Sequence, residues 1–225
     1  MSGIINILKW VLIAIGAIAV YYGVSLHVKY DGVTGKIISE MVSPKLHPES
    51  MEKVYMPMTN KLLDTGDITM ASIVRVPVAK DVTNEDVEEA MESIANGEGI
   101  RSVGMLPLSE MVEIQTNDEG VTKGHPDFKA QRFLKIYQYC APRTAMTMVS
   151  YSDAFSAYLP CRIALVEDQK HFETGGKEGD RWLYTLDMNA MIYGGEPLPD
   201  DLLEKALTVQ STIDAIQKGG AEGDF

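Results

Sequence analysis

The sequence predicts an α+β domain whose helices pack on one antiparallel sheet, preceded by a single N-terminal transmembrane helix. Three observations predict this class: a long apolar run at the N-terminus, several short alternating runs, and two amphipathic stretches with helix start and stop signals. The expected order of the domain is strand–helix–four strands–helix. The expected boundaries are an anchor over 1–30, a tether with short helical pieces over 31–67, the α+β domain over 68–218 and a frayed tail over 219–225.

The N-terminal run over residues 4–28 is almost entirely apolar and contains one lysine, Lys9. A helix that crosses a bilayer needs about 20 apolar residues, and Trp10 together with Tyr21 and Tyr22 resembles interfacial aromatics. Bulky residues after the run argue against a signal-peptide cleavage site. We therefore predict a signal anchor held in the lipid bilayer, and a single-pass membrane protein. We expect the soluble domain to be exported to the periplasmic or extracytoplasmic side, rather than cytoplasmic, although the lysines after the run slightly oppose this orientation.

The composition excludes several classes of protein. The formal net charge of −12 argues against nucleic acid as a partner, because phosphate binding requires clustered Lys and Arg. It also argues against a polybasic contact with anionic lipids. Two cysteines are too few for a disulfide-dense scaffold or for a common four-ligand zinc site.

The tether carries several thioethers near one imidazole, a combination that suits Cu(I). These residues are Met41, His47, Met51, Met56 and Met58. Their spacing matches no regular metal motif, and methionine is a common gap-filler on adaptable surfaces. We therefore assign no metal ligand.

Alternating apolar residues predict the strands. The first run is 67–80, in which Pro77 ends the strand or marks a sheet edge. Its apolar face consists of Met70, Val74, Val76 and Val78. Further strands are expected over 99–108, 132–140, 161–168 and 181–187, with a polar connection over 109–129 and a hairpin loop over 169–180.

Two helices are predicted from the residues that favour the start and the end of a helix. In the stretch 82–99, Thr83 or Asn84 can cap the start, and Asn96-Gly97 can supply a left-handed stop. The second helix begins after Pro199 and follows an amphipathic period until Gly219, which we expect to terminate it.

Four short stretches carry a resemblance to a known family: "CAP" at 140–142, the helix "RTAMTMVS" after it, "YLPC" at 158–161 and "ALVED" at 164–168. They look like the domain-of-unknown-function 302 family, and the resemblance covers about residues 68–218. It implies the same strand–helix–four-strands–helix fold and homodimer formation, and it places Asp187 where that family has a turn aspartate. It implies no established chemistry. Two features depart from the family pattern: Ala141, where the family often has a polar residue, and the added anchor with its tether.

Both cysteines of the chain lie at the ends of one loop. If strands 132–140 and 161–168 are antiparallel neighbours, Cys140 and Cys161 meet at one sheet edge, within reach of a disulfide. If the register is offset, they are two small buried hydrophobes. A helix that starts at Pro142, with Arg143 close by, would favour the thiolate form of Cys140. The sequence has neither a CxxC pair nor a histidine placed as a base.

Aromatic residues surround the two cysteines and either pack in the core or line a small pocket with Arg143, suited to a planar or anionic ligand. They are Tyr137, Tyr139, Tyr151, Phe155 and Tyr158. The candidate ligand or redox residues are Cys140, Pro142, Arg143, Tyr158 and Cys161. We assign no catalytic residue and no cofactor.

Our leading hypothesis is a non-enzymatic, membrane-anchored accessory or ligand-binding domain of a membrane-associated complex. Its partners would be the bilayer, other subunits of that complex and further copies of the chain. One alternative is a thiol-based redox or sulfur-handling protein that uses Cys140 and Cys161. The other is a purely structural oligomer subunit, which would bury an apolar interface on the open face of the sheet.

Overall fold

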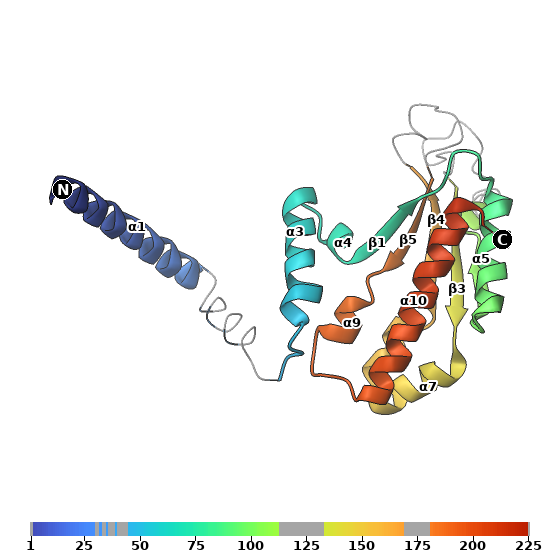
Figure 1. Cartoon of the computed structure of the whole chain (residues 1–225). Coiled ribbons are helices and arrows are strands. Elements are labelled where there is room, and N and C mark those ends of the chain that lie inside the picture. Colours follow the sequence, from blue (N-terminus) through green and yellow to red (C-terminus); the bar gives the residue numbers. More distant parts are fainter. Residues whose placement is uncertain are drawn as a thin grey trace.

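The computed structural model describes residues 2–29, 45–112, 133–168 and 181–224, with three isolated positions at 32, 35 and 39 (Figure 1). The predicted hairpin loop 169–180, the larger part of the predicted connection 109–129 and most of the first half of the tether lie outside the described residues.

One antiparallel sheet organises the domain. Its strands, in chain order, are β1 (Ile73–Pro77), β2 (Arg101–Leu106), β3 (Leu134–Cys140), β4 (Cys161–Glu167) and β5 (Arg181–Leu186). In space they follow the order β1-β5-β4-β3-β2, and each strand is antiparallel to its neighbours. The predicted α+β class with one antiparallel sheet is confirmed.

Two long helices cover one face of this sheet and contact each other, α5 (Asn84–Gly97) and α10 (Asp200–Glu222) (Figure 1). Shorter helices interrupt the simple expected order of elements. Between β3 and β4 lie α7 (Pro142–Tyr151) and the 3₁₀ helix η2 (Asp153–Tyr158), and α9 (Asn189–Tyr193) follows β5.

The main core lies between the sheet and the two long helices. Strand periodicity places alternate residues of β4 and β5 on that face, where Ile163, Leu165 and Leu183 are completely buried. Met91 of α5 and Ile216 of α10 are equally buried and belong to the same apolar cluster. Burial of each such side chain contributes about 1.5–3 kcal/mol. The core thus fixes the sheet against α5 and α10.

A second, smaller core lies at one end of the sheet and joins α7, α9 and the start of α10. It consists of Met148, Ile192, Leu198, Leu202 and Ala206. This cluster holds α7 and α9 in place beside the ends of β3, β4 and β5.

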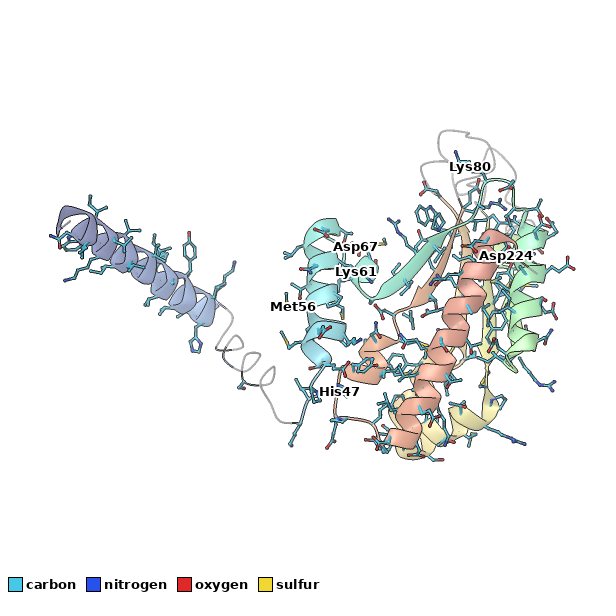
Figure 2. The ribbon with its side chains drawn as sticks, in the orientation of Figure 1. His47, Met56, Lys61, Asp67, Lys80 and Asp224 are labelled. Atoms are coloured by element: carbon cyan, nitrogen blue, oxygen red, sulfur yellow. The ribbon has the colours of Figure 1, made fainter. Side chains whose placement is uncertain are left out.

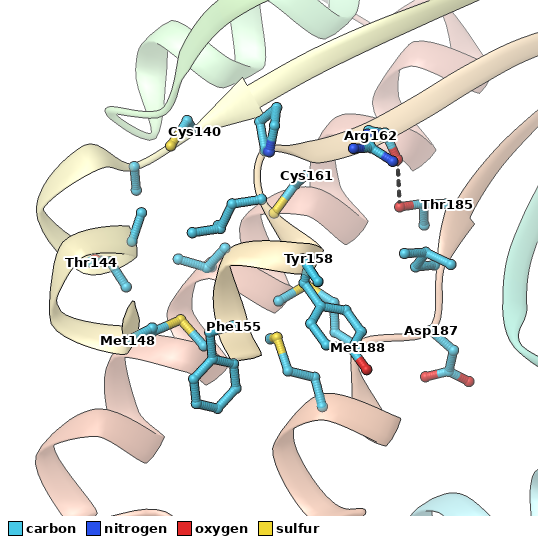
Figure 3. Close-up of a pocket in the computed structure, with 18 residues that line it drawn as sticks. Cys140, Thr144, Met148, Phe155, Tyr158, Cys161, Arg162, Thr185, Asp187 and Met188 are labelled. Atoms are coloured by element: carbon cyan, nitrogen blue, oxygen red, sulfur yellow. Dashed lines mark hydrogen bonds between the residues drawn. The ribbon is translucent and has the colours of Figure 1, made fainter. Parts of the chain in front are cut away.

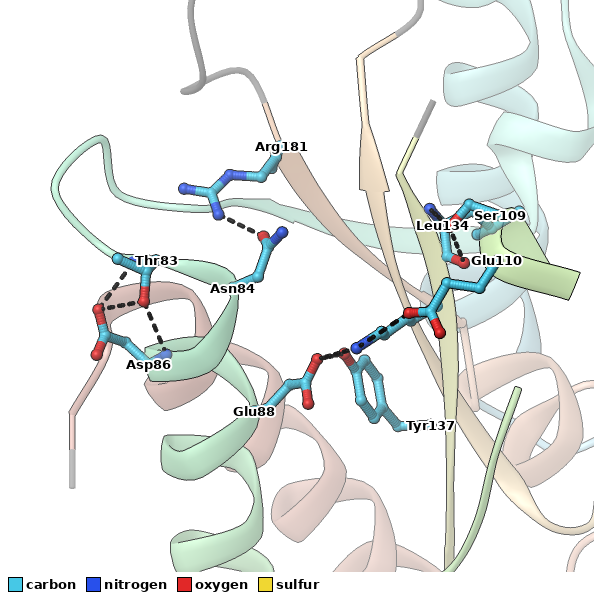
Figure 4. Close-up of polar contacts among 10 residues, drawn as sticks. Thr83, Asn84, Asp86, Glu88, Ser109, Glu110, Leu134, Tyr137 and Arg181 are labelled. Atoms are coloured by element: carbon cyan, nitrogen blue, oxygen red, sulfur yellow. Dashed lines mark hydrogen bonds and ion pairs between the residues drawn. The ribbon is translucent and has the colours of Figure 1, made fainter. Parts of the chain in front are cut away.

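A polar cluster also ties α5 to the sheet (Figure 4). The Tyr137 hydroxyl donates a hydrogen bond of 2.7 Å to Glu88 Oε1, and Lys135 Nζ lies 2.9 Å from the same oxygen. Glu110 pairs more loosely with Lys135, at 3.8 Å. The half-buried Glu88 carboxylate therefore joins helix α5 to strand β3.

Helix α5 begins as predicted but ends differently. Thr83 caps it: the Asp86 N–H donates to the Thr83 hydroxyl, and the Asp86 carboxylate accepts from the Thr83 N–H, which completes a capping box. The left-handed residue after the helix is Gly99, with φ of +73°, and not Gly97.

Helix α10 continues past Gly219, where we expected it to stop, and ends at Glu222 before the left-handed Gly223. The two glycines at 219 and 220 have a packing role instead. A Cβ on Gly220 would lie 2.4 Å from Met91 Cγ, so the absent side chain is what lets α10 approach α5.

The start of the first strand differs from the prediction. Met70 belongs to the short helix α4 (Ile68–Ala71), because Asp67 caps that helix by accepting a hydrogen bond of 2.8 Å from the Thr69 N–H. Strand β1 therefore begins at Ile73. It does end at Pro77 and it is an edge strand, as that proline predicted.

The second half of the predicted tether is helical and contacts the domain. The π-helical turn η1 (Met51–Tyr55) runs directly into α3 (Met56–Thr65), because Pro57 lies in the first turn of α3, where a missing N–H is tolerated. Lys61 reaches from α3 to the Ile73 carbonyl at 3.0 Å (Figure 2). This segment is thus joined to the edge strand of the sheet.

Helix α1 (Ser2–Lys29) precedes the domain. Its stretch Ile5–Lys29 is long and apolar enough to cross a membrane, a property that signal sequences share, and none of it is buried against the rest of the protein.

Candidate functional site

The two cysteines lie where β3 ends and β4 begins, as the sequence predicted, but not opposite each other. Cys161 pairs with Tyr139 across the β3–β4 ladder, and Cys140 pairs with Arg101 on the other side of β3. Because neighbouring residues in a strand point to opposite faces, an offset of one position directs the two thiols differently.

The possible disulfide between Cys140 and Cys161 is not supported. Both cysteines are free thiols. The physical reason is the register: a disulfide between antiparallel strands needs two residues that face each other, and Tyr139 occupies the position opposite Cys161.

A narrow pocket of about 50 Å³ opens beside the cysteines (Figure 3). Its walls come from the ends of β3, β4 and β5, from α7 and η2, and from α9 and α10. The Cys161 side chain points from β4 into this space, whereas Cys140 lies at the junction of β3 and α7. The smaller core described above forms part of the floor through Met148.

The polar groups around the pocket are few, and the structure fixes two of them in place. The Thr185 hydroxyl donates a hydrogen bond of 2.8 Å to the Arg162 carbonyl. The Asp187 carboxylate accepts from the Asn189 N–H at 3.1 Å and pairs with Lys61 at 3.5 Å. The lining of the pocket is therefore mainly apolar, and two of its polar side chains, those of Thr185 and Asp187, are already engaged by the protein.

The environment of the pocket raises the pKa of both thiols. Burial raises the pKa of Cys161 to about 11, and the neighbouring Cys140 contributes in the same direction. Burial also raises the pKa of Cys140. Both thiols are protonated at neutral pH, so the start of α7 and Arg143, which could have favoured a thiolate, do not lower the pKa of either cysteine.

The predicted site residues divide into two groups. Cys140, Cys161 and Tyr158 line the pocket. Pro142 and Arg143 lie in the exposed first turn of α7 and are not among the lining residues.

The surrounding aromatics divide in the same way. Phe155 lines the pocket beside Tyr158, whereas Tyr137 and Tyr139 are buried in the main core. Tyr151 is exposed at the end of α7. Arg143 is therefore not among the residues that line the pocket, and the cation among them is Arg162.

Sequence reasoning missed most of the pocket walls. Met148 comes from α7, while Met188 and Met191 come from the turn and helix after β5. The only signal that could have indicated them was the turn aspartate Asp187, which lines the pocket next to Met188.

Within the described residues, no group of three or more His, Cys, Asp or Glu side chains lies together in a way that could hold a metal ion. The tether residues that we considered for copper and did not assign as ligands have other surroundings. Met51 and Met56 are exposed, His47 packs against the Tyr193 ring with centroids 4.9 Å apart, and Met41 lies outside the described residues.

A five-stranded antiparallel sheet with two helices on one face, and a pocket where inserted helices meet the strand ends, defines a two-layer α+β domain. Comparison with known families gives the particular group. The family described as "Domain of unknown function DUF302" matches residues 74–218, and the chain belongs to this family.

Among solved structures, the chain is similar to the crystal structure of an uncharacterized conserved DUF302 protein from Bacillus stearothermophilus. The two share 14% sequence identity, and the match covers 65% of this chain and 96% of the other, with a TM-score of 0.45. No curated protein matches the chain.

Proposed function

We propose that this protein is a membrane-anchored accessory domain that binds a small ligand in the pocket beside Cys140 and Cys161 and serves a membrane-associated complex. The observation that carries the proposal is the pocket itself. It is narrow and apolar, and it is built by α7 and η2, which are inserted between two strands of an otherwise simple sheet. Concave apolar sites with few polar groups are where proteins bind small molecules.

Helix α1 supports the membrane part of the proposal. As an anchor, it would hold the domain near a membrane complex and raise its local concentration without any additional contact. The domain would lie on the exported side of the membrane.

The protonation of the thiols favours binding over thiol catalysis. A nucleophilic cysteine acts as a thiolate, which a lowered pKa supplies. Both pocket thiols have raised pKa values. A redox or sulfur-handling enzyme that uses Cys140 and Cys161 is therefore the weaker proposal.

Photocrosslinking in native membranes tests the accessory role. We would place a photoreactive amino acid at Tyr158, which lines the pocket and is 46% exposed, and at the exposed Glu98 as a control. We expect a discrete adduct at position 158 that position 98 does not give. A full-length chain that forms no adduct at 158, and that is monomeric after detergent extraction, would overturn the accessory role.

A second candidate function, a structural oligomer subunit, is favoured by the sheet face opposite α5 and α10. Strand alternation places apolar side chains there: Ile136, Ala164, Val166, Trp182 and Tyr184, all half-buried, with Leu106 and Leu186 exposed at the strand ends. A homo-oligomer that pairs these faces would cover them.

The oligomer has its own test. Ala164→Arg places a charge at the centre of that face, and Leu207→Arg on the exposed side of α10 is the matched control. We expect the full-length chain in detergent to sediment as an oligomer that only Ala164→Arg dissociates. A wild-type chain that sediments as a monomer at all concentrations would exclude this function.

A further inference from the structure

Sulfur is concentrated in the walls of the pocket. Five of its eighteen lining residues carry sulfur, namely Cys140, Met148, Cys161, Met188 and Met191. The whole chain has thirteen methionines and two cysteines in 225 residues. One third of the sulfur-containing side chains therefore lines a single narrow cavity. The first and the last of them, Cys140 and Met191, are 51 positions apart in the sequence.

From this arrangement, and building on the ligand-binding function proposed above, we propose that the pocket binds one soft monovalent metal ion of the Cu(I) type, through the Cys161 sulfur and the thioethers of the methionines around it. Thiolate and thioether sulfur are the protein ligands that select Cu(I).

The size of the pocket favours an ion over a larger molecule. A space of about 50 Å³ accommodates a few water-sized groups. Binding sites for drug-sized molecules are typically about 300–1,000 Å³.

The chemistry of the walls favours a soft ion over a hard one. Hard cations require several oxygen ligands, and zinc is held by cysteine, histidine and carboxylate. Here the one carboxylate in the lining, that of Asp187, is already paired with Lys61 at 3.5 Å, and no histidine lines the pocket. The thiols and thioethers of the lining are soft ligands, which suit a soft ion.

Charge balance favours a monovalent ion. Binding breaks the Cys161 S–H bond, forms a sulfur–metal bond and releases one proton to solvent, without transfer of an electron. One thiolate with one Cu(I) is neutral, whereas one thiolate with a divalent ion would leave a net charge inside apolar walls, which is costly.

The orientation of the side chains selects Cys161 as the central ligand. Cys161 projects into the cavity from the start of β4 (Figure 3), and Met188, in the turn after β5, is another of the lining residues. Cys140 lies further out, at the start of α7.

The test is a competition titration of the full-length chain in detergent, with Cu(I) supplied as its bicinchoninate complex under anaerobic conditions with ascorbate. We expect one equivalent of Cu(I) to be transferred from the bicinchoninate complex to the chain. Cys161→Ser should reduce the affinity by about a hundredfold, and Met148→Leu or Met188→Leu by about tenfold each, with circular dichroism to show that each variant is folded.

The matched controls are Met146→Leu, on the exposed side of the same helix α7, and Met56→Leu, on α3 among the tether methionines. Neither should change the affinity. Loss of binding in Met56→Leu, with Cys161→Ser unchanged, would overturn the proposal by assigning the metal to the tether.

Xenon binding, followed by ¹²⁹Xe NMR, separates the failure of this proposal from the failure of the proposed function, because xenon occupies apolar cavities without ligand chemistry. A chain that takes up xenon but no Cu(I) would overturn the metal site and leave the ligand pocket intact. A chain that takes up neither would overturn both.

Discussion

Tyr139 lies directly opposite Cys161 in the β3–β4 ladder. This pairing places Tyr139, and not the second cysteine, at the position across from Cys161, and it leaves Cys140 one position beyond, paired with Arg101 of β2. Both thiols are therefore free, and their different burial should be measurable.

Alkylation should distinguish the two thiols. We expect iodoacetamide at pH 8 to modify Cys140 faster than Cys161, because Cys161 is more deeply buried and its pKa is raised to about 11. Peptide mass spectrometry of the full-length chain gives both rates, and the urea-unfolded chain is the control. A Cys161 rate equal to that of the unfolded chain would contradict the buried position.

The stability of the domain should fall in alkaline solution. In the folded chain the pKa of Cys161 is raised from 9.0 to about 11, so between these values the unfolded chain has lost its proton while the folded chain retains it. The contribution of Cys161 is complete below pH 9 and is lost as pH rises toward 11, by about 2–3 kcal/mol at most. Thermal unfolding of wild type and Cys161→Ala from pH 7 to 10.5 measures it.

Wild type and Cys161→Ala should differ in how steeply their stability falls as the pH rises. The buried hydroxyls of Tyr137 and Tyr139 also have raised pKa values and add a decline of the same sign above pH 10. Cys161→Ala should therefore decline less steeply than wild type from pH 9 up to the end of the measured range at pH 10.5, because the variant lacks the Cys161 thiol. Parallel curves from pH 7 onward would refute the assignment to Cys161.

The close contact of α5 and α10 should not tolerate a side chain at Gly220. A Cβ there would lie 2.4 Å from Met91 Cγ and 3.4 Å from Leu183 Cδ1, so Gly220→Ala overpacks a buried position. We expect a loss of about 1–3 kcal/mol in the free energy of unfolding. Gly97→Ala, at a helical glycine with nothing within 4 Å, is the matched control and should be neutral or slightly stabilising.

The Glu88 carboxylate should matter more than either of its partners alone. Tyr137→Phe removes one hydrogen bond of 2.7 Å while Lys135 still neutralises Glu88, and we expect a loss of about 1 kcal/mol. Glu88→Ala removes the partner of both side chains, and among the described residues Lys135 then keeps the looser pair with Glu110 at 3.8 Å and its contact with the Phe133 ring. Chemical denaturation of both variants, with the exposed Tyr151→Phe as control, should give the larger loss for Glu88→Ala.

The strands could be predicted because alternation of apolar residues is a local signal, and the cap at Thr83 could be predicted for the same reason. The upstream limit of β1 was wrong because Asp67 also fits an alternating run, although in the structure it caps a helical turn. In that stretch, a polar residue able to accept a backbone N–H was the better signal.

The pairing of Cys161 with Tyr139 could not be predicted. Register depends on how two strands align across a long insertion, and a shift of one residue reverses which side chains share a face. The pocket could not be predicted from the sequence for a related reason. Met148, Met188 and Met191 fit ordinary core positions in the sequence, and only the tertiary structure brings them to one cavity with Cys161.

The segment that follows α1 in the sequence is hydrogen-bonded to the part of the chain that forms one wall of the cavity. The Tyr55 hydroxyl donates to the Gly194 carbonyl at 2.9 Å, and the His47 N–H donates to the Gly195 carbonyl at 2.8 Å, both directly after the helix α9 that carries Met191. In the proposed membrane-anchored protein, these two hydrogen bonds would make residues 47–55 the connection between the anchor side of the chain and the end of α9. A displacement of this segment would therefore act first on the part of the chain that carries the lining residue Met191.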